Sequence, residues 1–397
     1  MNLLANVSLF LIWGPIVYGR YAAIVGIWSV LSAFAALGIE KSALKHIPRY
    51  QRIGPYLTGY FIGLLFIACL VLLGAIVGIQ MIASGDDAFN ALSRLEVQVS
   101  LTCLLLGNSL CLSSIGRAHG KPAFDMLSSI ALGLAILTAL YLTYLFQWSS
   151  LGFTYIYNSI LLIANLAGVV FLLPYTRFSI RKRRLLGLAY KWSIEAFLMS
   201  LNLVLATTAV SVVYLTFRLV GSFEEVSHFN IAALVFGTAY AFFHYCFGIL
   251  LPSISVSIRE RGVAWIYLSL SRNKKWLLSL MMAASGLAIL GSSYLWMNHY
   301  GLPANLGLIW FWLLLTPFFL SAEFLTIIFE MLERPNIISS IGASALALLL
   351  ITICAFVAIP RLGALGGIIS LLVGEAAVSV FLLVRLKGLA GHAQAGA

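Results

Sequence analysis

The sequence is a succession of long apolar stretches separated by short charged segments. One stretch, residues 21–38, contains no charged residue and is followed by basic residues that include Lys41 and Lys45. A membrane crossing needs about 20 consecutive apolar residues, and Lys and Arg near helix ends favour the cytoplasmic side. This stretch therefore predicts a membrane-crossing helix that ends at Leu37 and Gly38 and leads into a cytoplasmic basic loop.

The composition excludes a soluble protein. The 397 residues are 62% hydrophobic and 9% charged, with a mean hydropathy of +1.02, whereas soluble domains carry about 25% charged residues. The net charge of +11 does not indicate nucleic-acid binding, because no soluble domain underlies the basic segments. It fits cytoplasmic loops that face anionic lipid. The five cysteines lie in apolar runs without a CxxC pair, so we expect no metal or other cofactor.

Hydropathy predicts an all-α polytopic membrane protein with about twelve transmembrane helices. The predicted crossings are residues 1–14, 21–38, 56–82, 97–116, 123–146, 152–173, 194–217, 228–252, 275–297, 305–329, 336–358 and 364–385. Gly14-Pro15 has the character of a turn between the first two. The first crossing is short, so either its neighbours cap it or the natural chain begins upstream of Met1.

The distribution of charge predicts the topology. With the N-terminus inside, all but four of the 24 Lys and Arg residues lie in inner loops; the exceptions are Arg20, Arg94, Arg218 and Arg361. This asymmetry places both termini in the cytoplasm. The outer loops are short and leave no room for an extramembrane active site. We therefore expect a protein that is not an enzyme.

The two halves of the chain share local features. Lys121-Pro122 opens the fifth predicted crossing, and Arg334-Pro335 opens the eleventh, about half the chain later. Such parallel repeats are typical of transporters, with the substrate at the interface of the halves. We predict two pseudo-symmetric lobes around a central cavity: a six-helix lobe at 1–176, a basic cytoplasmic linker at 177–193 and a second six-helix lobe at 194–397.

Polar residues within the crossings are the candidates for chemistry, because hydrocarbon penalises them. Thr316, Glu323, Thr326 and Glu330 share one helical face by their spacing, and Pro317 interrupts the same helix. Glu375 lies in the last crossing. These features favour a proton or cation site at Glu323 and Glu375. They also fit Glu323 bonded to a neighbouring helix and Glu330 in the inner loop.

The candidates for substrate binding are Arg20, Arg218, Glu195, Asn202 and His244. Arg20 and Arg218 lie near the outer ends of crossings in the two halves, and arginine is a natural partner for phosphate. Snorkelling to the lipid headgroups explains them equally well. Glu195 and Asn202 share a face, as do Asn158 and Asn165, for which hydrogen bonding between helices is the commoner role. His244, deep in a crossing, is more often a packed core residue than a ligand.

The sequence resembles the oligosaccharide flippases of the polysaccharide biosynthesis (Wzx-like) family, within the superfamily that also holds multidrug and lipid II exporters. The residues that carry the resemblance are Tyr18-Gly19-Arg20-Tyr21-Ala22, Gly38 with the basic segment to Arg49, Pro252 with the Ser-rich segment after it, and Pro360-Arg361-Leu362-Gly363-Ala364-Leu365-Gly366-Gly367. Arg20 is the one candidate that lies in a matched motif. The sequence departs from the family by its short first helix.

The resemblance implies a transporter that flips an undecaprenyl-diphosphate-linked oligosaccharide across the inner membrane by alternating access. The expected partners are this substrate, membrane lipids, H⁺ or Na⁺ as the coupling ion, and a polysaccharide polymerase or glycosyltransferases. The alternatives are a cation-coupled multidrug exporter, a membrane-embedded glycosyltransferase or polymerase, and a membrane scaffold. The absence of a GxxxxGK[ST] motif excludes ATP hydrolysis by this chain.

Overall fold

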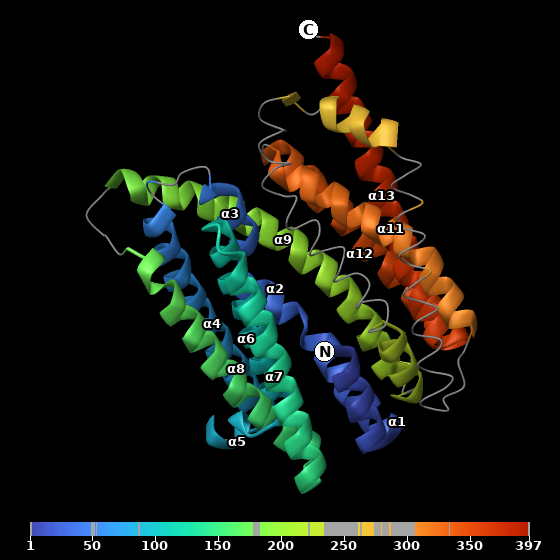
Figure 1. The fold of residues 1–397 in the computed structure, drawn as a ribbon. Helices are drawn as coiled ribbons and strands as arrows, with labels where there is room; N and C mark the ends of the chain where they lie inside the picture. Colours follow the sequence, from blue (N-terminus) through green and yellow to red (C-terminus); the bar gives the residue numbers. More distant parts are fainter. Residues whose placement is uncertain are drawn as a thin grey trace. The chain divides into compact units, whose positions relative to one another are not determined.

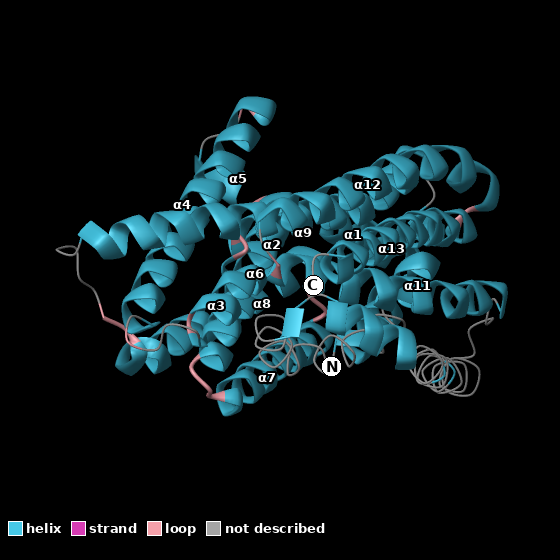
Figure 2. Ribbon diagram, turned by 90° about the horizontal axis from the view of Figure 1, so that it is seen from above, coloured by secondary structure: helices cyan, strands magenta, loops and turns pink. Residues whose placement is uncertain are grey.

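A computed structural model describes residues 2–48, 52, 54–85, 88–177, 183–220, 223–233, 261–262, 264–273, 279, 286, 306–332 and 334–395. These residues form helices and short turns without a strand (Figure 2). Seven of the described helical spans are long and apolar enough to cross a membrane. The chain is therefore an all-α, multi-pass membrane protein, as the sequence predicts.

The chain divides into two compact units. The first comprises Met1–Gly14 and Arg20–Thr207, and the second comprises Pro15–Gly19 and Thr208–Ala397. The division falls inside the helix α9 (Arg183–Val220). The predicted linker at 177–193 is helical from Arg183 onward. Its second part therefore belongs to α9. The predicted lobe boundaries stay a prediction.

The first unit is a bundle of long helices (Figure 1). Its elements are α1 (Asn2–Trp28, shared with the second unit), α2 (Val30–Ala36), α3 (Ile39–His46), α4 (Gly54–Ser84), α5 (Ala88–Leu92), α6 (Leu95–Ala118), α7 (Pro122–Phe146), α8 (Ser150–Leu172), the short 3₁₀ helix η2 (Leu173–Tyr175) and the first part of α9. The predicted crossings in this region agree with α4, α6, α7 and α8 to within a few residues.

The break between the first two predicted crossings lies where the sequence placed it. Gly14 has non-helical backbone angles (φ 74°, ψ 168°), and α1 resumes at Pro15. Pro15 lacks the backbone N–H that a helix interior needs, so a break at this point is expected. The second predicted crossing also ends as expected, because Leu37 and Gly38 both have positive φ.

The basic segment after Gly38 is a helix, which corrects the prediction of a loop. Ile39 and Ala43 lie four residues apart and are both buried on one side of α3. Such spacing lets a helix bury an apolar face. Gly38 allows the change of direction, because its positive φ suits glycine, and a side chain there would collide with the backbone of Ala196 on α9.

α2 is held between α6 and α9 within the first unit. Gly107 of α6 lies against the backbone of Ser32, where a larger residue would clash. Ser200 Oγ of α9 donates to the carbonyl of Ala33 at 3.4 Å. Small residues of this kind let helix backbones approach closely in membranes.

The surface of the first unit is apolar. Phe66, Leu70 and Val71 on α4 are more than half exposed, as are Ile163 and Val170 on α8. Exposed aliphatic and aromatic side chains at this density would aggregate in water and are stable against lipid. The outward faces of these helices therefore fit a hydrocarbon solvent.

The second unit contains the end of α9, residues 223–233, α11 (Leu306–Met331), α12 (Arg334–Leu362) and α13 (Ala364–Ala395). α11, α12 and α13 pack together (Figure 1). The predicted tenth, eleventh and twelfth crossings match these helices. The predicted eighth and ninth crossings, 228–252 and 275–297, lie largely outside the described residues.

The motif at 360–367 forms the tight turn from α12 to α13. Gly363 has a positive φ of 56°, and a side chain at Gly366 would collide with the backbone of Ala358. Glu225 caps the start of α13, because its Oε2 accepts from the N–H of Ala364 at 2.7 Å. A carboxylate at a helix N-terminus satisfies a free N–H and complements the helix dipole.

Candidate functional site

The sequence-predicted substrate residues occupy different surroundings. Arg20, in the first unit, and Arg218, in the second, are exposed. Asn202 on α9 is 2% exposed, so its side chain belongs to the interior of the first unit. His244 lies outside the described residues. The two arginines are therefore the predicted residues that a ligand can reach in this conformation.

Glu195 lies in a buried charged cluster at the junction of α3 and α9. Its Oε2 is 3.3 Å from Lys45 Nζ and 3.2 Å from His46 Nε2. The side chains of the two basic residues are 6% exposed and that of Glu195 is 13% exposed. The His46 ring stacks on Trp192 with the ring centroids 4.8 Å apart. Glu195 is thus neutralised within the protein and links two helices.

The two carboxyl groups predicted for ion coupling lie in the second unit. Glu323 is on α11 and Glu375 is on α13, and both are half-buried. They are within range of each other's charge. The helices are joined nearby, because Ser379 Oγ of α13 donates to the carbonyl of Phe318 on α11 at 2.8 Å. Two like charges repel strongly in a medium of low dielectric. A proton or cation bound here would relieve that repulsion.

The polar face of α11 points inward, as its spacing predicts. Thr316 and Thr326 are at most 9% exposed, and Glu330 is fully buried. The helix continues through Pro317. Glu330 is therefore part of the protein interior and not of an inner loop, so that alternative reading of the sequence is wrong.

The kinked part of α1 is held by hydrogen bonds within the second unit. Asn230 Nδ2 donates to Tyr18 Oη at 2.6 Å, and Tyr214 Oη donates to Asn230 Oδ1 at 2.5 Å. Ser227 Oγ donates to the carbonyl of Pro15. Sequence reasoning chose Tyr18 through its motif but missed Asn230. The signal was available, because Asn230 is polar within a predicted crossing.

The asparagines of α8 connect this helix to α6. Asn158 Nδ2 donates to the carbonyl of Gln98 at 2.9 Å, and Thr102 Oγ1 donates to Asn158 Oδ1 at 2.6 Å. Asn165 Nδ2 donates to the carbonyl of Leu105 at 3.1 Å. The prediction that these asparagines bond neighbouring helices is confirmed.

Solved structures of membrane transporters have this fold. An outward-facing multidrug resistance MATE family transporter of the MOP superfamily is 13% identical, with a TM-score of 0.67 over 100% of this chain and 94% of its own. A MOP superfamily transporter from Pyrococcus furiosus, described as having a binding pocket of reversed polarity, is 12% identical, with a TM-score of 0.64 over 98% and 91%. The lipid II flippase MurJ, in an inward closed conformation, is 14% identical, with a TM-score of 0.65 over 97% and 84%.

No protein family profile and no curated protein sequence matches this chain. At these identities, the likeness to the solved structures establishes the fold. The fold is that of the MOP superfamily transporters, in which twelve helices cross the membrane. A fold hosts several functions, and the function has to be argued from residues.

Proposed function

We propose that this chain is a transporter that flips an undecaprenyl-diphosphate-linked oligosaccharide across the inner membrane by alternating access, for the synthesis of a surface polysaccharide. The observation that carries the proposal is the fold likeness, over nearly the whole chain, to a flippase of lipid II. The likeness to multidrug transporters makes a cation-coupled multidrug exporter the alternative.

Charge favours an anionic substrate over a cationic one. A diphosphate carries negative charge through the membrane, and Arg20 and Arg218 are positive groups outside the inner loops. In the first unit, the buried carboxylate of Glu195 is already paired with Lys45 and His46. Glu195 is therefore not available to an organic cation, and a cation site would have to use Glu323 and Glu375 in the second unit.

Arg20 and Arg218 are the proposed contacts for the diphosphate. Both residues are exposed, and arginine binds phosphate oxygens with two parallel hydrogen bonds. Each residue lies in a different unit.

Glu323 and Glu375 are the proposed coupling groups. Uptake of one proton or Na⁺ between the two carboxylates lowers their mutual repulsion, and its release restores the repulsion. Because the carboxylates lie on α11 and α13, this cycle changes the force between two helices. Protonation is thereby linked to the packing of the second unit.

The proposal also assigns a place in the cell. Both termini lie in the cytoplasm, and a polysaccharide polymerase or glycosyltransferases supply and consume the lipid-linked sugar. The protein performs no covalent chemistry on its substrate. Its inner basic segments face the anionic lipid of the cytoplasmic leaflet.

The test uses the full chain reconstituted in liposomes that contain a polyprenyl-diphosphate disaccharide with a dye on the sugar. An impermeant quencher removes the signal of the outer leaflet, and flipping exposes the protected half. Arg20→Ala and Arg218→Ala should each slow flipping by at least about tenfold, because a hydrogen bond to a charged group contributes about 1.5–3 kcal/mol. Arg94→Ala and Arg361→Ala, which remove other arginines near predicted outer helix ends, are the matched controls.

Each outcome separates the candidate functions. Flipping that depends on Arg20 and Arg218, and that stops in Glu323→Gln, supports the proposal with its site. Flipping that is equal in all four arginine variants removes the site assignment. Absence of flipping, together with uptake of a cationic dye into the same liposomes, would show that the protein is a multidrug exporter.

A further inference from the structure

A groove of about 520 Å³ runs between α4, α6 and α8 in the first unit. It opens onto the apolar surface of this unit, because rim residues such as Phe66 on α4 and Leu166 on α8 are more than half exposed. Its lining on α4 extends from Ile62 to Leu73, which is about 16 Å at about 1.5 Å per residue. One leaflet contributes about 15 Å to the hydrocarbon core. The groove therefore has the length of one acyl chain in one leaflet.

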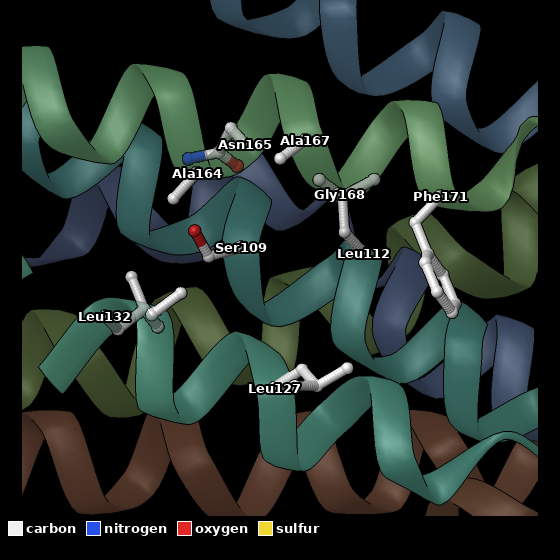
Figure 3. Close-up of a pocket in the computed structure, with 10 residues that line it drawn as sticks. Ser109, Leu112, Leu127, Leu132, Ala164, Asn165, Ala167, Gly168 and Phe171 are labelled. Atoms are coloured by element: carbon white, nitrogen blue, oxygen red, sulfur yellow. The ribbon is translucent and has the colours of Figure 1, made fainter. Parts of the chain in front are cut away.

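A second cavity, of about 180 Å³, lies between α6, α7 and α8. Figure 3 shows Ser109 of α6 in this cavity, with Leu127 and Leu132 of α7 on the opposite side from Asn165 of α8. Ligand sites in proteins have volumes of about 300–1,000 Å³. The second cavity is therefore too small for a lipid chain, whereas the groove is large enough.

The helix faces that line the groove lead to a polar pair at one end. On α6, His119 follows the lining residue Leu112 by seven positions. On α4, Thr58 precedes the lining residue Ile62 by four positions. At this spacing each polar residue lies on the face that lines the groove. The two residues meet, because Thr58 Oγ1 is 2.7 Å from His119 Nε2. This end of the helices is the one predicted to face the cytoplasm.

Exposed cations lie next to this pair. Lys121 Nζ is 5.9 Å from the ring centroid of Tyr175, and the centroids of the Tyr175 and His119 rings are 5.5 Å apart. Arg177 is held at the start of α4, because its backbone N–H donates to the carbonyl of Pro55 at 2.9 Å. Lys121 and Arg177 are both exposed. The groove therefore ends at positive charge, about 6 Å beyond its last lining residue on α4.

The charge of this end stays positive. Arg52, which is exposed and lies three residues before Pro55, adds a third cation. None of the three cations forms an ion pair with a side chain that the structure describes. The acidic residue nearest to them in the sequence is Asp125, four positions after Lys121, and its side chain lies outside the described part of the structure. One carboxylate cannot neutralise three cations.

We propose that the groove and its cations form a site for an anionic glycerophospholipid of the inner leaflet, with one acyl chain in the groove and the phosphate bound by Lys121 and Arg177. The hydrocarbon walls accept the chain of any lipid, and the cations select the charge of the headgroup. Basic pockets between transmembrane helices on the cytoplasmic side are known sites for anionic headgroups. This site is separate from the arginines and carboxylates proposed for transport.

The test is photolabelling of the full chain in phosphatidylcholine nanodiscs that contain a trace of a lipid with a diazirine in one acyl chain. The two probes have the same chains and differ in the headgroup, which is phosphatidylglycerol in one and phosphatidylcholine in the other. Each Lys or Arg near a membrane surface attracts an anionic lipid by about fivefold. The phosphatidylglycerol probe should therefore label α4, α6 and α8 at least about tenfold more strongly.

Variants locate the site. Lys121→Ala with Arg177→Ala should remove most of the preference for phosphatidylglycerol and leave labelling by phosphatidylcholine unchanged. Arg385→Ala with Lys387→Ala is the matched control, because it removes one exposed arginine and one exposed lysine from the predicted inner end of α13. Gly63→Phe should reduce labelling by both probes, because Gly63 lines the groove and a side chain there meets open space.

Two further controls isolate the chain and the headgroup. Gly78→Phe adds the same side chain on α4 at another open position outside the groove, and labelling should stay as in the wild type. Glycerol 3-phosphate in large excess offers the headgroup chemistry without a chain and should not compete. If Gly63→Phe fails to fold, the double variant at Lys121 and Arg177 still decides, because it changes exposed residues.

Four results would overturn the proposal. Equal labelling by the two probes shows that the cations select nothing. A preference that falls as much in the α13 control as in the double variant at Lys121 and Arg177 shows a diffuse surface potential and no site. Labelling that is unchanged in a folded Gly63→Phe protein shows that no chain occupies the groove. Full competition by glycerol 3-phosphate shows a site for a soluble anion. None of these results bears on flipping, which is measured separately.

Discussion

Replacing Glu195 with glutamine should destabilise the first unit strongly. The substitution keeps the shape of the side chain but removes its charge, so Lys45 stays buried, at 6% exposure, without its carboxylate. Removing one partner of a buried ion pair costs about 3–5 kcal/mol. At about 2–4 °C per kcal/mol for a unit of this size, a loss of 3 kcal/mol lowers the melting temperature by about 6–12 °C.

The assay is a thermal scan of tryptophan fluorescence on the purified full chain in detergent, at one fixed scan rate. Glu195→Met with Lys45→Met provides the control, because replacing both charges with apolar groups of similar volume is often neutral. We expect the double variant to melt within about 3 °C of the wild type. A double variant that melts as low as Glu195→Gln would refute the reasoning. If Glu195→Gln leaves the melting temperature unchanged but abolishes flipping, the result would instead support the prediction that Glu195 contacts substrate.

Two further predictions concern the helix cap and acid. Glu225→Gln weakens the cap on Ala364, which costs about 1 kcal/mol and should lower the melting temperature by about 2–4 °C. Glu224 is the exposed neighbour, and Glu224→Gln should leave the melting temperature unchanged. Equal shifts in the two variants would contradict the cap. Burial lowers the pKa of His119, so the unfolded chain takes up a proton before the folded one, and stability should fall as the pH drops below about 6.5. His119→Gln should flatten melting temperatures measured between about pH 5 and 7.5; a slope that persists would assign the acid sensitivity elsewhere.

The course of the helices could be predicted from the sequence, because membrane crossings are encoded locally. Each apolar stretch is long enough to be recognised by itself, and the break at Gly14-Pro15 follows from the backbone chemistry of two residues. The basic segment after Gly38 was misread as a loop. Its burial depends on a carboxylate 149 or more positions away in the sequence, and hydropathy contains no information on such pairs.

The candidate site was predicted less completely. Polar residues in apolar stretches were recognised correctly as inward-facing, as with Thr316 and Thr326 on α11. Which residues meet could not be predicted, because pairing is set by helix packing. Glu195 was interpreted as a ligand for substrate, and the structure pairs it with Lys45.

The hydrogen bonds of Pro15 and Tyr18 have a consequence for the synthesis and membrane insertion of the protein. Their partners, Ser227 and Asn230, lie 212 residues further along the chain. At a synthesis rate of about 5–20 residues per second, the kinked part of α1 waits roughly 10–40 seconds for these partners to emerge. Contacts of such long range form late and slowly. α1 is therefore synthesised first but gains these hydrogen-bond partners among the last. Until then, the insertion machinery has to keep its polar groups away from lipid.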